Sequence, residues 1–118
     1  MNKKIKKRIL RNLKIWKENL MLGIDQDIKS IEDSKNIQEL MNCKSILLNR
    51  MVSEIPLGDD TCYFCQAQLI KGQGLTCEKC EYAKIHGMCI DDKNSTFERI
   101  ANHMNNLHNL LNYYARIK

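Results

Sequence analysis

The stretch CYFCQAQLIKGQGLTCEKCEYAKIHGMC, residues 62–89, carries five of the six cysteines of this 118-residue chain. Cys62 and Cys65 form one C-x2-C pair and Cys77 and Cys80 form a second, with eleven residues between the pairs. Two intervening residues let a tight turn direct both sulfurs at one point, and two such pairs supply the four thiolates of a tetrahedral zinc site. The spacing therefore predicts zinc binding by these four cysteines.

The end of the same stretch leaves the ligand set open. His86 and Cys89 form an H-x2-C unit, which also has ligand spacing. Of the residues that could replace one of the four cysteines or add a further ligand, Cys89 ranks first and His86 ranks second. Four thiolates can instead hold an iron–sulfur cluster, which is the alternative cofactor. A thioredoxin-like redox site is disfavoured, because that site needs a single C-x2-C after a strand in a βαβ pattern.

The residues between and after the two pairs suggest how the site is built. AQLI (67–70) and LT (75–76) have strand-like composition, and KGQG (71–74) supplies glycines for a turn, which predicts a β-hairpin. CEKCEYAKIHG (77–87) is predicted to form a short helix that ends at Gly87. A knuckle, a hairpin and a helix in this order predict a treble-clef finger. A zinc ribbon, with the second pair on another knuckle, is the alternative.

Working outward, the preceding half of the chain has helical periodicity. Apolar residues recur at steps of three and four from Ile5 to Ile31, past Gly23, which is a candidate helix stop. The phase slips at DSKN (33–36), where polar residues that favour helix caps predict a break. A second helix then runs to Ile55.

The segment after the cysteines has the most regular helical pattern. Ser95 and Glu98 form a capping box, and apolar residues follow at alternating steps of three and four up to Tyr114. We therefore expect a mainly α fold: a small helical bundle whose apolar stripes face one another, with the metal-binding hairpin inserted. Residues 1–118 are predicted to be a single domain, with helical segments in 1–55, the cysteine-rich insert in 60–90 and the last helix in 95–116.

Charge is concentrated at the start of the chain. The net charge is +5, yet eight basic residues precede the first acidic one, so the remainder sums to −3. Such a cluster can neutralise phosphates, which makes nucleic-acid binding the alternative function. The candidate residues are Lys3, Lys4, Lys6, Lys7, Arg8, Arg11 and Lys14.

The order of motifs resembles a set of small cysteine-rich bacterial and phage proteins that have no agreed activity. The resemblance rests on KIWKENL (14–20) in the first helix and on CYFC, CEKC and HGMC. It implies metal ligation by the two C-x2-C pairs and by Cys89. This chain departs from the pattern at Glu81, where a proline is usual, and in a shorter spacing to the last cysteine.

No catalytic constellation is visible, because the chain has no phosphate-binding loop, nucleophile elbow or HExxH motif. A zinc ion held by four thiolates has no open coordination position and serves a structural role, so we expect no enzyme activity. The leading hypothesis is a regulatory or inhibitory module of phage or mobile-element type that binds another protein. An iron–sulfur or redox sensor is a further alternative. Clustered cysteines without a signal or membrane segment indicate the cytoplasm. The last helix also allows a homodimer.

Overall fold

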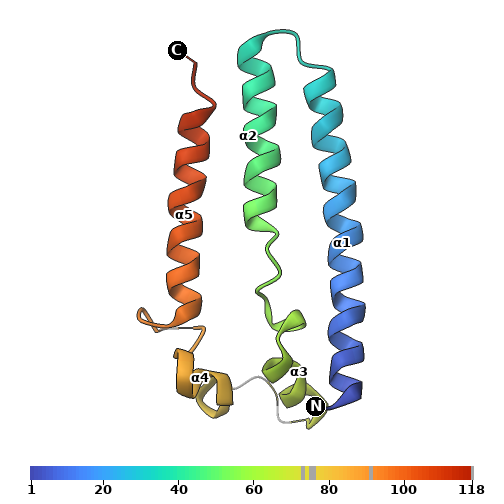
Figure 1. The fold of residues 1–118 in the computed structure, drawn as a ribbon, viewed down its shortest axis with the longest axis vertical. Coiled ribbons are helices and arrows are strands. Elements are labelled where there is room, and N and C mark those ends of the chain that lie inside the picture. The colour runs from blue at the N-terminus through green and yellow to red at the C-terminus, as the bar shows by residue number, and fades with distance from the viewer. Residues whose placement is uncertain (73, 75–76, 91, 118) are drawn as a thin grey trace. The chain divides into compact units, whose positions relative to one another are not determined.

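The computed structural model describes residues 1–72, 74, 77–90 and 92–117. This part of the chain contains five α-helices and no strand, which confirms the mainly α prediction (Figure 1). Short 3-10 turns, η1 (Asp59–Thr61) and η2 (Cys77–Lys79), precede α3 and α4 respectively. The helices are α1 (Lys3–Glu32), α2 (Ile37–Ser53), α3 (Tyr63–Ile70), α4 (Glu81–His86) and α5 (Thr96–Tyr114).

The chain divides into two compact units. Unit 1 consists of Met1–Trp16 and Pro56–Asn102, and unit 2 consists of Lys17–Ile55 and His103–Lys118. The long helices α1 and α5 each contribute residues to both units, whereas α3 and α4 belong to unit 1 and α2 to unit 2.

In unit 2, the predicted break at DSKN is confirmed by a capped helix start. The side chain of Asn36 accepts a hydrogen bond from the backbone N–H of Glu39 at 2.8 Å. The Glu39 carboxylate accepts one from the N–H of Lys35 at 2.7 Å. The first bond satisfies a backbone donor that a helix start leaves unpaired, and the second ties the residue before the cap to the helix.

Gly23 does not end α1, so its prediction as a helix stop is wrong. It lies inside the helix and is buried against the side chain of Arg50 on α2. A Cβ at Gly23 would come within 2.8–2.9 Å of three Arg50 atoms. The glycine therefore permits a close approach between helices, which local sequence periodicity does not reveal.

Polar side chains join the helices of unit 2, and α2 lies between α1 and α5 (Figure 1). Toward α1, both Arg50 Nε and Nη2 donate to the Asp27 carboxylate, at 2.5 and 3.2 Å. Toward α5, Asn49 Nδ2 donates to Asn112 Oδ1 at 2.9 Å, and Asn49 Oδ1 lies 2.5 Å from Nδ1 of His108. These contacts hold the three helix segments in register.

Part of the apolar stripe predicted for the second helix remains exposed on α2, although the stripes were expected to face one another. Ile37 is 70% exposed, Met51 51% and Leu40 39%. Among the described hydrophobic residues of unit 2, Ala115 alone is classed as buried. The sides of α2 that contact α1 and α5 carry polar residues instead, which is why the stripe lies outside the helix contacts.

In unit 1, the first half of α1 packs against the segment that leads into and through α3. Ile5 is 4% exposed. Arg8 Nε donates to Gln66 Oε1 at 3.0 Å, and Asn12 Nδ2 donates to the carbonyl oxygen of Asp60 at 2.7 Å. The beginning of α1 is thereby attached to the cysteine region.

The first strand of the predicted hairpin is wrong, because residues 67–70 form the second half of α3. A four-residue apolar run fits a strand or a buried helix turn equally well, and tertiary contacts decide between them. Here Gln66, 3% exposed, donates to the carbonyl oxygen of Asp59 at 3.0 Å and accepts from Arg8, so α3 is fixed by contacts on both sides. The second predicted strand, Leu75 and Thr76, lies outside the described residues.

Candidate metal centre

Each C-x2-C pair lies where a helix begins. Cys62 directly precedes α3 and Cys65 lies in its first turn. Cys77 opens the turn η2, and Cys80 directly precedes α4. The backbone is extended at Cys62 and Cys80, so at both positions the chain changes direction as it enters a helix. Two helix starts, rather than a knuckle and a hairpin, position the four thiols.

These four cysteines and Cys89 line the same cavity, which has a volume of about 290 Å³. Thiols from three stretches of chain, residues 62–65, residues 77–80 and Cys89 after α4, therefore line one cavity in unit 1. The remaining walls are largely apolar and include Leu57, Tyr82, Ala83, Ile90 and Phe97.

The thiols influence one another electrostatically. Burial raises the pKa of Cys65 to about 12, and the neighbouring Cys62 and Cys80 act in the same direction. Burial also raises the pKa of Cys89, with Cys62, Cys77 and Cys80 adding to the shift. Apolar surroundings and neighbouring negative charge both disfavour a thiolate, so Cys65 and Cys89 hold their protons at neutral pH when no cation is near.

The donor types fit zinc, while their arrangement is more open than a zinc site. Four thiolates at about 2.3 Å from the ion would bring the sulfurs to roughly 3.8 Å from one another. Within the described ranges, no group of three or more His, Cys, Asp or Glu side chains is placed so that it could hold a metal ion. The sulfurs would therefore have to draw together around an ion.

His86, the second substitute ligand, is engaged away from the thiols. Its ring stacks on Tyr82, with centroids 4.3 Å apart and planes 20° apart. Its Nδ1 lies 3.0 Å from the hydroxyl of Thr96. His86 is not among the described residues that line the cavity, whereas Cys89 is. Between the two substitutes, the fold brings Cys89 to the other cysteines.

Gly87 turns the chain from α4 back toward the cavity, and the predicted end of the helix at this residue is confirmed. Its φ of 79° lies in the region that side chains disfavour. A Cβ here would collide with the Asp92 carboxylate and come within 3.0 Å of Ser95. Asp92 in turn accepts from the N–H of Met88 at 3.2 Å, so the turn that carries Cys89 is closely packed.

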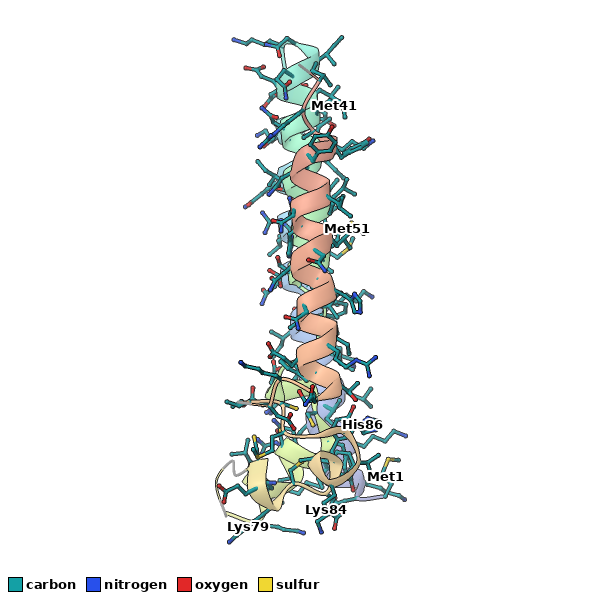
Figure 2. The ribbon with its side chains drawn as sticks, turned by 90° about the vertical axis from the view of Figure 1, so that its left-hand side faces the viewer. Met1, Met41, Met51, Lys79, Lys84 and His86 are labelled. Atoms are coloured by element: carbon teal, nitrogen blue, oxygen red, sulfur yellow. The ribbon has the colours of Figure 1, made fainter. Side chains whose placement is uncertain are left out.

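The predicted basic residues lie on α1 within unit 1. All are exposed except Arg8, which is half-buried and bonded to Gln66. Helical spacing places Lys3, Lys7, Arg11 and Lys14 along one face, while Ile5 lies on the buried side. We call these four residues the basic face. Lys79 and Lys84 add charge to the cysteine region and extend outward from it (Figure 2).

The net charge of the chain is carried by unit 1. This unit contains twelve basic and seven acidic residues, a net of +5, while unit 2 contains seven of each and is neutral. The same unit therefore holds the thiol-lined cavity, the basic face and the whole excess of positive charge.

Sequence reasoning missed several residues that shape this region. Gln66 is a buried polar residue whose two hydrogen bonds join α1 and η1 to α3, and no periodicity marks it. Ile85 and Ile90 flank the Gly87 turn and are 82% and 63% exposed. In the sequence, these two isoleucines could have been recognised only as apolar residues within a stretch that is otherwise polar and rich in possible metal ligands.

No helix in the described part of the chain combines the length and the apolar character that a membrane span requires. Comparison of the chain with protein-family models, with curated proteins and with solved structures finds no match.

Proposed function

We propose that this protein is a small zinc-stabilised regulatory or inhibitory module that acts by binding another protein. The observation that carries the proposal is the pair Ile85 and Ile90, which are 82% and 63% exposed on the segment that ends α4 and carries Cys89. Large apolar side chains on a turn fixed by Gly87 are suited to fill pockets on a partner. An intracellular setting, in which thiols stay reduced, belongs to the proposal.

In this proposal zinc has a structural role, held by Cys62, Cys65, Cys77 and Cys80, with Cys89 as the fifth thiol nearby. A shell of four thiolates leaves no coordination position for a substrate, so the protein is not an enzyme. Metal binding of this type supplies about 10 kcal/mol or more in zinc-finger peptides, which becomes folding free energy. The shared cavity of the five thiols supports this assignment. The partner surface then depends on the metal.

Metal content tests the zinc assignment directly. The purified, reduced protein is expected to be colourless and to contain one zinc per chain by elemental analysis. Cys62→Ser and Cys80→Ser should lose zinc, while Cys43→Ser is the matched control because Cys43 lies on α2 in unit 2. A brown protein that contains iron and sulfide would replace zinc with an iron–sulfur cluster.

Capture from the native host tests the partner. Tagged wild-type protein is expected to recover a specific protein, and Ile85→Asp, whose site lies outside the cavity lining, should lose it, because a charge cannot enter an apolar pocket. Ile15→Asp is the control, since Ile15 is 50% exposed on α1 in the same unit. Recovery of nothing but the chain itself would defeat the proposal.

Nucleic-acid binding is the second candidate, and the exposed basic face favours it. Lys3, Lys7, Arg11 and Lys14 repeat about once per helical turn without an intervening acidic residue. A surface that contacts about five phosphates loses roughly 10²–10³-fold in affinity between 50 and 200 mM salt, because bound counterions are released.

Fluorescence anisotropy with labelled duplex DNA and with RNA tests this candidate. The variant Lys3→Gln/Lys7→Gln/Arg11→Gln should abolish low-salt binding. The control Lys84→Gln/Lys93→Gln/Arg99→Gln removes the same charge from exposed positions of unit 1 outside the basic face. Equal weakening in both variants would indicate a general charge effect, and absence of binding at low salt would eliminate the candidate.

A further inference from the structure

Unit 2 buries polar side chains and exposes apolar ones. Asp27 and Ser45 are 6% and 5% exposed, and both take part in the hydrogen bonds that join the helices. Thirteen of the twenty exposed large hydrophobic residues in the described chain belong to this unit. Contiguous exposed apolar surface is unusual on a monomer and marks an interaction site.

Five apolar side chains follow one face of α2. Ile37, Leu40 and Met51 are exposed, and the half-buried Leu47 and Leu48 continue the same face at steps of three and four. Met51 extends outward from the helices in Figure 2. We call this set the α2 stripe.

Lys44 lies on the same face of α2 as the stripe, and its ammonium group is paired with a residue of α5. Lys44 Nζ donates to the hydroxyl of Tyr114 on α5 at 2.7 Å and lies 5.2 Å from the centroid of that ring. Its ammonium is thus directed toward α5. The lysine therefore does not prevent the stripe from being covered.

We propose that a second copy of this chain covers the α2 stripe, so that unit 2 forms the interface of a homodimer. The segments of α1, α2 and α5 in unit 2 lie side by side, with α2 in the middle (Figure 1). Helices bury an apolar stripe by packing against a second layer. Two copies related by a two-fold axis each supply that layer to the other through the same residues.

The size of unit 2 agrees with one dimer interface. Its segments of α1 and α2 are 16 and 17 residues long, and its segment of α5 is 12 residues long. With a rise of 1.5 Å per residue and 8–10 Å between neighbouring axes, a face made by these three helices measures roughly 600 Å². A stable interface buries about 800 Å² on each partner, so this face is close to the required size.

Charge also favours a second copy over a strongly charged partner. Unit 2 is neutral, with seven basic and seven acidic residues, so two copies meet without net repulsion between these units. A neutral surface provides no long-range attraction for a polyanion or for an acidic or basic protein.

The mass of the full chain in solution tests the proposal. Sedimentation equilibrium of the purified, metal-loaded protein is expected to give twice the chain mass of 13.8 kDa. Leu40→Glu and Met51→Glu should raise the dissociation constant at least about 100-fold, because each places a charge in the apolar contact. Ile46→Glu is the matched control on α2: Ile46 is 56% exposed but lies on the other side of the helix.

Three results would overturn the proposal, and the first two are a wild-type mass of one chain at 100 µM and a dimer that Ile46→Glu disrupts while Leu40→Glu and Met51→Glu leave it intact. A monomer that captures a different protein through the stripe also overturns it. The wild type provides a readout that no variant can confound, because the melting temperature of a dimer rises with protein concentration. Failure of this proposal can be distinguished from failure of the proposed function, because the test with Ile85 concerns unit 1.

Discussion

Gly87 is the single residue on which the position of Cys89 depends most directly. We expect Gly87→Ala to lower the free energy of unfolding by about 2–3 kcal/mol. With φ 79° and ψ 165° the backbone lies in a region essentially restricted to glycine, which costs an alanine about 1–3 kcal/mol, and the new Cβ also meets Asp92 and Ser95. Urea unfolding of the metal-loaded protein, followed by circular dichroism, measures the change.

Gly72→Ala separates the cost of the backbone conformation from the cost of the contacts made by the new Cβ. Gly72 has a φ of 70° and nothing within 4 Å of its would-be Cβ, so the substitution carries the conformational cost alone. Equal losses in the two variants would mean that packing around Gly87 contributes nothing to stability.

Cys65 makes the metal-free protein sensitive to alkali. Burial, together with Cys62, raises its pKa to about 12 from an ordinary value of 9.0. The folded state therefore binds this proton more tightly than the unfolded state, and the stability it confers is present below pH 9 and lost as the pH rises toward 12.

Chemical unfolding of the metal-free, reduced protein at several pH values checks this. Stability should fall more steeply above pH 9 in the wild type than in Cys65→Ser, with Cys43→Ser retaining the wild-type slope. Parallel curves for all three proteins would contradict the assigned shift at Cys65.

Among the elements, α1 and α2 are joined by a bidentate ion pair. Asp27 is almost fully buried, and its hydrogen bond to Arg50 raises the pKa of the guanidinium, which therefore stays charged. We expect Arg50→Met to lower the free energy of unfolding, because it leaves a buried carboxylate unpaired. Denaturant unfolding at fixed protein concentration measures it.

The double variant Asp27→Asn/Arg50→Met tests the reason for that loss. The double variant should lose less free energy of unfolding than the two single variants lose in sum, because no unpaired charge then stays buried. Strict additivity of the two single variants would show that the pair is not coupled.

The long helices were predictable, and α3 was not. The apolar periods before Ser53 and after Ser95 extend over many turns, and the predicted caps are present: Asn36 and Ser95 each accept from the N–H three residues later. The eight residues of α3 are too few for a period to be distinguished. Gln66 and its tertiary hydrogen bonds hold this helix in place, and such contacts are not visible in a local pattern.

The cysteines that line the cavity could be singled out from the sequence, but the rest of the cavity could not, and metal binding by these cysteines stays a prediction. The C-x2-C spacing identified the paired cysteines that line the cavity, because a two-residue gap between cysteines is a local constraint that can be read from the sequence. The walls come from residues distant in sequence, such as Leu57 and Phe97. The choice of Cys89 over His86 at the cavity depends on the stacking of His86 on Tyr82, which spacing alone does not express.

For the whole molecule, metal removal should affect the two units unequally. If zinc holds the thiols, a chelator is expected to loosen unit 1, with loss of the helical signal of α3 and α4, while α2 in unit 2 persists. Trp16 is the single tryptophan and belongs to unit 1, so its fluorescence reports that unit. Circular dichroism at 222 nm reports all the helices together.

Re-addition of zinc should restore both signals, and Cys43→Ser should respond as the wild type does. Fluorescence and thermal unfolding that stay constant when the metal is removed would show that unit 1 is stable without it. Loss of all helical signal in one step would show that unit 2 also depends on the metal.

The uneven charge of the two units has a consequence for the dimer. If two copies join through unit 2, the dimer carries two units of net charge +5. A polyanion long enough to reach both would meet the second as a tethered group, at an effective concentration in the millimolar range for a short tether. Such a dimer would therefore hold long polyanions more tightly than short ones.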